Sequence, residues 1–167
     1  ERQHGPIEVA VHNVGANVWF PIRDTTVRVY TKVWEMGCLS GFLVGREAAR
    51  RMGPRGRGTI LFTGATASLR GRAQFAAFAG AKHALRALAQ SMARELGPEG
   101  IPVGPVVADG PIDTPWIRQQ FPDLVAQRPA DGLLAPDAIA EAYLPRHRQA
   151  RSAWTFELDL RPWVEPW

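Results

Sequence analysis

The sequence predicts an α/β protein with a parallel sheet in a Rossmann-like, three-layer arrangement. Short apolar segments typical of buried strands alternate with longer segments in which apolar residues recur at the helical period of about 3.6. Turns rich in glycine and proline separate these segments. The chain has 167 residues, of which 46% are hydrophobic and 22% are charged, which is the composition of a folded globular domain. We therefore interpret residues 1–167 as a single domain.

Each element follows from a local pattern. Strands are expected at residues 7–11, 59–63, 101–108 and 154–161. Helices are expected at residues 25–52, 74–96, 114–121 and 136–149. The first helix is expected to face inward through Val29, Val33, Met36, Leu39, Leu43 and Met52.

Prolines and an alternation of apolar and polar residues refine the prediction for the C-terminal half of the chain. Pro102 and Pro105 each remove a hydrogen-bond donor, so they predict a weakened or irregular third strand. Pro145 predicts a bend in the last helix. Strict alternation of apolar and polar residues over 154–161 predicts a strand with one buried face.

The composition argues against several classes of protein. The single cysteine, Cys38, cannot form an intrachain disulfide, which favours a cytoplasmic protein. No apolar run approaches the roughly 20 residues of a membrane-spanning helix. The net charge of +4 comes from dispersed arginines rather than one basic face, which argues against a nucleic-acid partner. His4, His12, His83 and His147 have no metal-ligand spacing, so no metal site is expected.

Three short motifs occur in order along the chain. The first is His12-Asn13-Val14-Gly15, at the end of the first expected strand. The second combines residues 64–71 with Phe78-Ala79-Gly80-Ala81-Lys82 on the next helix, and the third is residues 109–114. In this order and on these elements, the chain resembles the C-terminal two-thirds of a short-chain dehydrogenase/reductase domain.

This resemblance implies NAD(P)-dependent hydride transfer between a nicotinamide and a small alcohol or carbonyl compound. In the family, a tyrosine acts as the general acid/base, and a lysine four residues later on the same helix face lowers its pKa. Here Lys82 is present, but Phe78 occupies the tyrosine position. Ala65 and Gly37 occupy the positions of the family's serine and asparagine. The resemblance therefore identifies Lys82, Phe78 and Ala65 as the catalytic positions, with the catalytic tetrad degenerate.

Four other side chains are candidates to replace the missing catalytic groups. Thr66 or Ser68 could supply the serine's hydrogen bond, but an aliphatic hydroxyl is too weak an acid to replace tyrosine. His83 points about 100° away from Lys82 around the helix, which favours a surface role. Asp109 could accept a proton or make a turn hydrogen bond, and both readings stay open.

The resemblance also implies NAD or NADP as the cofactor. Carried over by motif, its contacts would be Asn13, Gly15, Lys82, Gly110, Ile112 and Thr114. Asn13 and Gly15 also suit a turn after a strand, and Thr114 also suits a helix cap. The family's N-terminal strands and its glycine-rich turn, which holds the pyrophosphate, have no counterpart in these residues.

Two functional hypotheses follow. The first is a short-chain dehydrogenase/reductase that is impaired or inactive as written. The alternative is a non-catalytic protein, either a nucleotide-binding subunit or an oligomerisation partner. The resemblance further implies a homo-oligomer formed through the helices of residues 25–52 and 74–96, with a monomer as the competing interpretation.

Overall fold

The computed structural model describes residue 1 and residues 3–166, and within them four strands form one parallel sheet. The strands are β1 (Val9–His12), β2 (Thr59–Ala65), β3 (Val103–Ala108) and β4 (Leu158–Leu160), and they lie in this order across the sheet. The predicted parallel α/β fold is thus confirmed, and the first strand begins two residues later than expected.

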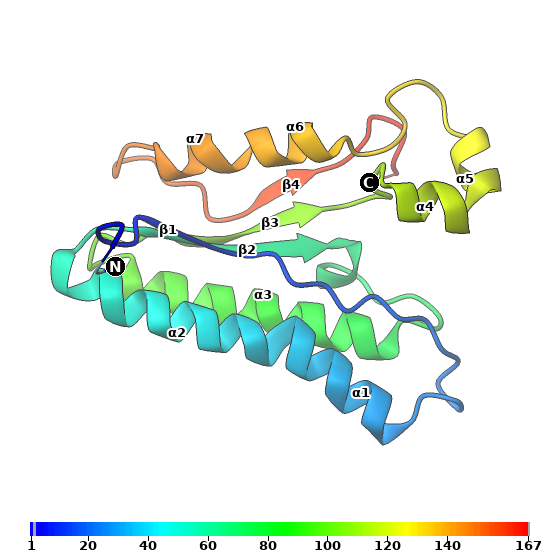
Figure 1. The fold of residues 1–167 in the computed structure, drawn as a ribbon, viewed down its shortest axis with the longest axis horizontal. Helices are drawn as coiled ribbons and strands as arrows, with labels where there is room; N and C mark the ends of the chain where they lie inside the picture. The colour runs from blue at the N-terminus through cyan, green and yellow to red at the C-terminus, as the bar shows by residue number, and fades with distance from the viewer. Residues whose placement is uncertain (2, 167) are drawn as a thin grey trace.

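Helices cover both faces of the sheet (Figure 1). One face carries α1 (Val27–Trp34), α2 (Ser40–Met52) and α3 (Ala76–Leu96), and the other carries α6 (Pro136–Glu141) and α7 (Tyr143–His147). Beyond the carboxyl ends of the strands lie α4 (Pro115–Gln120) and α5 (Pro122–Ala126). None of the helices in the described part of the chain combines the length and apolar character needed to cross a membrane.

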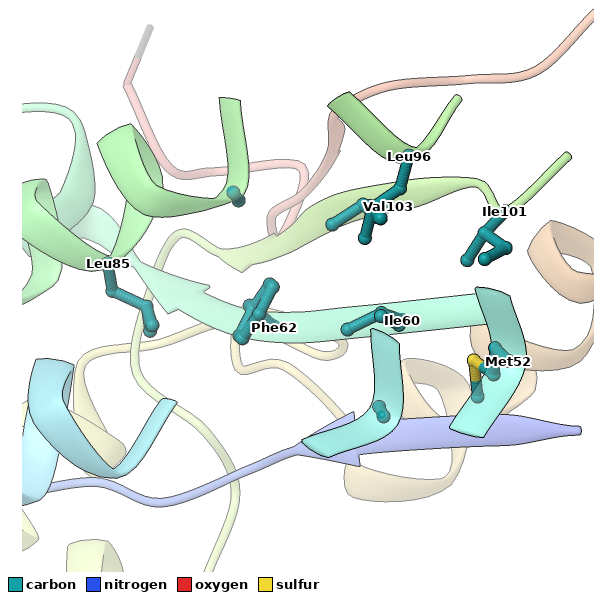
Figure 2. Close-up of a cluster of buried hydrophobic side chains, with 9 residues drawn as sticks. Met52, Ile60, Phe62, Leu85, Leu96, Ile101 and Val103 are labelled. Carbon is teal, nitrogen blue, oxygen red and sulfur yellow. The ribbon is translucent and has the colours of Figure 1, made fainter. Parts of the chain in front are cut away.

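The main core lies between the sheet and the α2–α3 layer (Figure 2). Ile60 and Phe62 of β2 point into this layer and are fully buried, as are Leu85 of α3 and Met52 of α2. Burying such side chains stabilises the fold by about 1.5–3 kcal/mol each. This packing fixes α3 against β2, and α3 is the helix that carries Lys82.

The long first helix differs from the prediction in its interior. A π-helical turn, Glu35–Leu39, separates α1 from α2. The extra residue in such a turn rotates everything after it, so one uniform 3.6-residue period cannot describe the whole helix. Met36 and Leu43, expected to face inward, are 41% and 47% exposed, and the small residues Gly41 and Gly45 face the core instead.

The third strand is regular, contrary to the prediction of a weakened strand. All six of its residues are buried and paired with β2 or β4. The backbone N–H and C=O of one strand residue point to the same side, and the C=O of Pro105 faces the segment that leads into β4. There Arg146 donates hydrogen bonds to the carbonyls of Pro105, Thr155 and Phe156, at 3.0, 2.6 and 2.8 Å. A buried guanidinium thus bridges the place where the proline lacks a donor.

The C-terminal elements are shorter than expected. The helix predicted over 136–149 divides into α6 and α7 at Ala142, three residues before Pro145. This is where a proline disrupts a helix, because its ring hinders the preceding turn. The strand predicted over 154–161 pairs only at Leu158–Leu160, because Arg146 holds the carbonyls of Thr155 and Phe156.

Candidate functional site

The candidate site lies at the carboxyl end of the sheet, where parallel α/β folds bind their ligands. Lys82 and Phe78 come from the first half of α3, and Ala65 ends β2. The segment after β1, residues 13–26, runs past the same end of the sheet before it enters α1 (Figure 1).

Lys82 is buried at 3% exposure, and its ammonium group is bound by the chain's own backbone. Its Nζ donates to the carbonyl oxygens of Thr63 at 2.9 Å and Val14 at 3.4 Å. Burial lowers the pKa of this amine to about 8. The site therefore contains a desolvated lysine whose two hydrogen-bond acceptors are backbone carbonyls.

Apolar side chains fill the space around the tyrosine position. Phe78 is buried at 8% exposure, and its ring centroid lies 5.9 Å from Lys82 Nζ and 6.4 Å from the ring of Phe75. Ala65 packs against the same apolar cluster. Ala16 and Val18, from the segment after β1, pack on it as well. No member of this cluster can give or take a proton.

The asparagine position is closed by packing. Gly37 lies in the π-helical turn, and a Cβ placed there would come within 3.0 Å of the Cβ of Ala81 on α3. A side chain there would require α3 or the π-helical turn to shift by a few tenths of an ångström. Glycine at this position therefore lets the two helices approach each other closely.

The two hydroxyls considered as replacements for the serine are already engaged. Ser68 is buried at 1% exposure, and its Oγ accepts a hydrogen bond from the backbone N–H of Ala65 at 3.0 Å. Thr66 Oγ1 donates to a carboxylate oxygen of Asp109 at 2.6 Å. In this structure both hydroxyls maintain the loop after β2.

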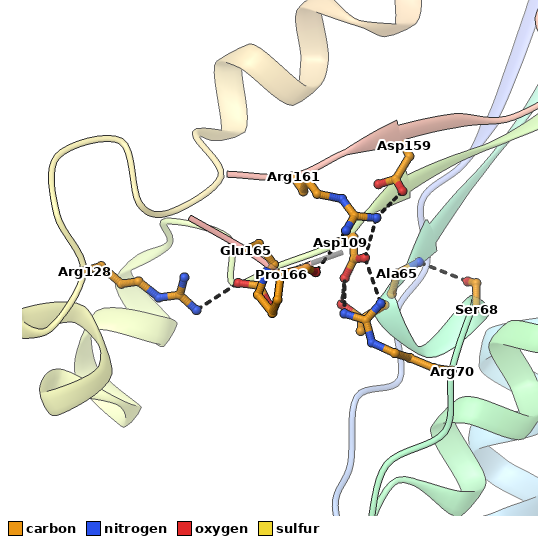
Figure 3. Close-up of polar contacts among 10 residues, drawn as sticks. Ala65, Ser68, Arg70, Asp109, Arg128, Asp159, Arg161, Glu165 and Pro166 are labelled. Carbon is orange, nitrogen blue, oxygen red and sulfur yellow. Dashed lines mark hydrogen bonds and ion pairs between the residues drawn. The ribbon is translucent and has the colours of Figure 1, made fainter. Parts of the chain in front are cut away.

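Asp109 anchors an ion-pair network that joins three segments (Figure 3). Its carboxylate is fully buried and accepts hydrogen bonds from Arg70 at 3.2 and 3.3 Å, while Arg161 lies 3.0 Å away. Arg161 also pairs with Asp159, and Arg128 pairs with Glu165 at 2.9 Å. Neither reading of Asp109 from the sequence describes this arrangement, because its arginine partners are 39 and 52 residues away in the chain.

The side chains of both tyrosines and of His83 contact groups other than the amine of Lys82. Tyr143 projects from α7, on the far face of the sheet, and its OH is 2.6 Å from Thr63 Oγ1. Burial raises the pKa of this phenol, which makes it a weaker acid. Tyr30 packs its OH near Gly80. His83 is exposed, with Nδ1 2.9 Å from the carbonyl of Ala79, as its position on the helix predicted.

The residues predicted to contact the cofactor occupy three places. Asn13 and Gly15 are exposed on the segment after β1. Gly110 has a φ of +147°, and Ile112 forms a bridge with Leu134. Thr114 caps α4 by accepting the N–H of Ile117 at 3.2 Å, which is the capping role foreseen for it. Among the described residues, no group of His, Cys, Asp or Glu could hold a metal ion.

A second buried base lies near Lys82. His12 is 2% exposed, and its Nε2 lies 2.8 Å from Ser40 Oγ. Because Ser40 Oγ donates to the carbonyl of Met36, Nε2 is the donor in this pair. Burial lowers the pKa of His12, and the charge of Lys82 lowers it further. Both effects favour the neutral imidazole.

The sequence analysis missed an aromatic cluster at this end of the sheet. Trp19, in the segment after β1, lies 6.0 Å from Trp116 of α4 and 5.7 Å from Phe121, between ring centroids. Trp116 and Phe121 are 5.8 Å apart and meet edge to face. Their separation of about a hundred residues from Trp19 leaves no local pattern that could reveal the contact.

Comparison with known proteins gives a consistent picture. The family model described as enoyl-(acyl carrier protein) reductase matches residues 1–145. A 3-oxoacyl-[acyl-carrier-protein] reductase, MabA of Mycobacterium avium, is 37% identical over 119 residues, which cover 71% of this chain and 46% of the relative. The inactive 2-(S)-hydroxypropyl-CoM dehydrogenase 2 of Xanthobacter autotrophicus is 31% identical over 152 residues, covering 85% of this chain and 66% of the relative.

Solved structures agree with the sequence matches. A short-chain dehydrogenase from Rhodopseudomonas palustris is 50% identical, with a TM-score of 0.79 over 96% of this chain and 65% of its own. A gluconate dehydrogenase structure from Agrobacterium tumefaciens, titled as putative, is 25% identical, with a TM-score of 0.83 over 95% of this chain. The chain thus spans about half to two-thirds of the length of these relatives.

Proposed function

Because this chain belongs to the short-chain dehydrogenase/reductase family, we propose that it is a member whose site has lost hydride-transfer chemistry. In the family that chemistry needs a general acid at the position of Phe78. The chain then acts as a non-catalytic subunit that contributes its fold to an assembly. The alternative, retained oxidoreductase activity toward a small alcohol or carbonyl compound, requires an acid from elsewhere.

One observation carries this proposal: Phe78 is buried in an apolar cluster that includes Ala65. If position 78 were open to solvent, water or another acid could still protonate a substrate there. Here Ala16 and Val18 cover the position, and Ser68 and Thr66 are bound to neighbouring groups. Proton transfer to a carbonyl oxygen has no donor among these side chains.

The site also fits a nicotinamide dinucleotide poorly. The group would supply a hydride when bound, with Lys82 holding its ribose and Asn13, Gly15, Gly110, Ile112 and Thr114 beside it, as in the family. Lys82 Nζ, however, is shielded from solvent and bonded to the carbonyls of Thr63 and Val14. We therefore propose that Lys82 is not available to a NAD or NADP ribose in this chain.

Turnover assays test the loss of chemistry. The purified chain is incubated with NADH or NADPH and a set of small aldehydes and ketones, and absorbance at the nicotinamide band is followed. We expect no turnover from the native chain and none from Lys82→Ala. Native turnover that Lys82→Ala abolishes would refute the proposal. The variant Ala65→Ser/Phe78→Tyr restores two of the three missing groups, the serine and the tyrosine, and shows whether these two alone limit turnover while Gly37 stays in place.

The outer surface of the first two helices supports the role in an assembly. Val27 is 83% exposed, Trp34 is 40% exposed, and Phe42 and Leu43 are exposed on α2. Exposed apolar residues that gather on one region mark interaction surfaces. We propose that the chain forms a homo-oligomer through the helices of residues 25–52 and 74–96.

Sedimentation velocity tests this association. Trp34→Glu places a charge in the proposed interface and is expected to shift the native oligomer toward monomer. Trp163→Glu is the matched control, because Trp163 is 73% exposed and its indole N–H donates to the carbonyl of Ala130, which belongs to neither helix. A native chain that sediments as a monomer at tens of micromolar would contradict the proposed homo-oligomer.

A further inference from the structure

The segment after β1, residues 13–26, contacts three separate parts of the carboxyl end of the sheet. Its Val14 carbonyl accepts a hydrogen bond from Lys82 Nζ at 3.4 Å. Its Ala16 and Val18 pack on the cluster that contains Phe78. Its Trp19 reaches α4, where it meets Trp116 and Phe121. The segment thus covers the lysine rather than merely connecting β1 to α1.

A backbone contact adds a fourth attachment with an unusual geometry. The N–H of Phe20 donates to the carbonyl of Gln74 at 2.9 Å, just before α3 begins. Gln74 has a φ of +71°, in the left-handed region that a residue with a side chain seldom adopts. Such strain is typical of clamps and switches, where the surrounding contacts maintain it.

We propose that residues 13–26 form a lid over Lys82, and that the Trp19–Trp116–Phe121 cluster is the latch that keeps the lid closed. The latch rings remain partly exposed, at 39% for Trp19 and 46% for Trp116. Each ring contact is therefore a modest interaction that local opening can break without unfolding the core. The lid shares its covering residues, Ala16 and Val18, with the proposed loss of catalysis. Its test measures access to Lys82 rather than turnover, so failure of the one is distinguishable from failure of the other.

The lysine content of the chain provides a direct readout. Lys82 and Lys32 are its two lysines, and the Lys32 side chain is 69% exposed. Reductive methylation with formaldehyde and dimethylamine–borane, followed by peptide mass spectrometry, gives the labelling rate of Lys82 relative to Lys32. In the native chain we expect Lys82 to be labelled much more slowly than Lys32, despite its lower pKa, because the closed lid covers it.

Removing a latch ring should raise this ratio. Trp116→Ala deletes both of its ring contacts and is expected to increase relative labelling of Lys82 at least tenfold. Trp163→Ala is the matched control: it removes an exposed tryptophan that donates to the Ala130 carbonyl, outside the latch, and should leave the ratio unchanged. The buried thiol of Cys38 reports on wider opening, because it reacts with a thiol reagent only when the α1–α2 region is exposed.

Each outcome bears on the lid. Faster labelling of Lys82 with Cys38 still protected supports local opening of residues 13–26. An unchanged Lys82 ratio in a folded Trp116→Ala protein overturns the proposal. If Trp116→Ala exposes Cys38 as well, the milder Phe121→Leu decides: a raised Lys82 ratio with Cys38 protected supports the latch, and an unchanged ratio overturns it.

Discussion

Lys82 occupies the family's lysine position, but burial of its amine destabilises the fold. Its amine is almost completely removed from water, and its pKa falls from 10.5 to about 8. A pKa difference of one unit corresponds to about 1.4 kcal/mol between the two protonation states. Near neutral pH the charged lysine therefore destabilises the fold by roughly 3 kcal/mol relative to a neutral amine at the same place.

This cost predicts a pH-dependent stability. Between pH 8 and 10.5 the unfolded chain binds a proton at Lys82 that the folded chain does not, so the free energy of unfolding rises with pH. Cys38 and Tyr143, whose pKa values burial raises, act in the opposite direction above about pH 9. We therefore compare the native protein with Lys82→Met by urea unfolding at each pH. From pH 8 to 9.5, the free energy of unfolding of the native protein should rise by roughly 2 kcal/mol relative to that of Lys82→Met. A difference that does not change with pH would mean that Lys82 keeps its ordinary pKa.

The sequence was enough to locate the candidate residues, but it did not predict their hydrogen-bond and ion-pair partners. Phe78, Ala65 and Lys82 were identifiable because they occupy fixed positions in one motif on one helix. That Ser68 binds the Ala65 N–H, or that Asp109 pairs with Arg70 and Arg161, depends on how separate strands and loops meet. No pattern along the chain contains that information.

Among the elements, the α1–α2 helix shows how packing overrides a simple period. The sequence predicted the helix because small and apolar residues recur throughout it. The π-helical turn Glu35–Leu39 then shifts which residues face the core, so that Gly37, Gly41 and Gly45 approach neighbouring elements closely. A helical period read along the sequence does not reveal such a turn, because the turn changes the period locally.

Substitution at Gly37 tests this close approach. Gly37→Ala places a Cβ about 3.0 Å from that of Ala81, and overpacking of this kind costs about 1–3 kcal/mol. Gly71→Ala is the control, since a Cβ there meets nothing within 4 Å. Urea unfolding should show a clear loss for the first and little change for the second. Equal effects would mean that the π-helical turn has room for a side chain and that the asparagine position is not closed.

Across the whole molecule, the order of strands and helices was predictable because each connection in a parallel sheet needs a crossover, and the sequence alternates accordingly. The weak points of that prediction were interactions between distant segments. Arg146, from α7, donates to the carbonyl of Pro105 in β3, and Trp19 meets Trp116 across the end of the sheet. Within the described residues, the outer edge of β1 pairs with no strand, and Val9 and Val11 are exposed there.

We propose that the chain's own residues occupy the carboxyl end of this sheet, where the family holds its cofactor. Isothermal titration calorimetry of the native chain with NADH and with NADPH tests this proposal. With Lys82 bonded to two carbonyls and Phe78 covered by residues 13–26, we predict no saturable binding up to millimolar cofactor. Saturable binding in the micromolar range that Lys82→Ala weakens would overturn this proposal, because it would show an open nucleotide site at this lysine.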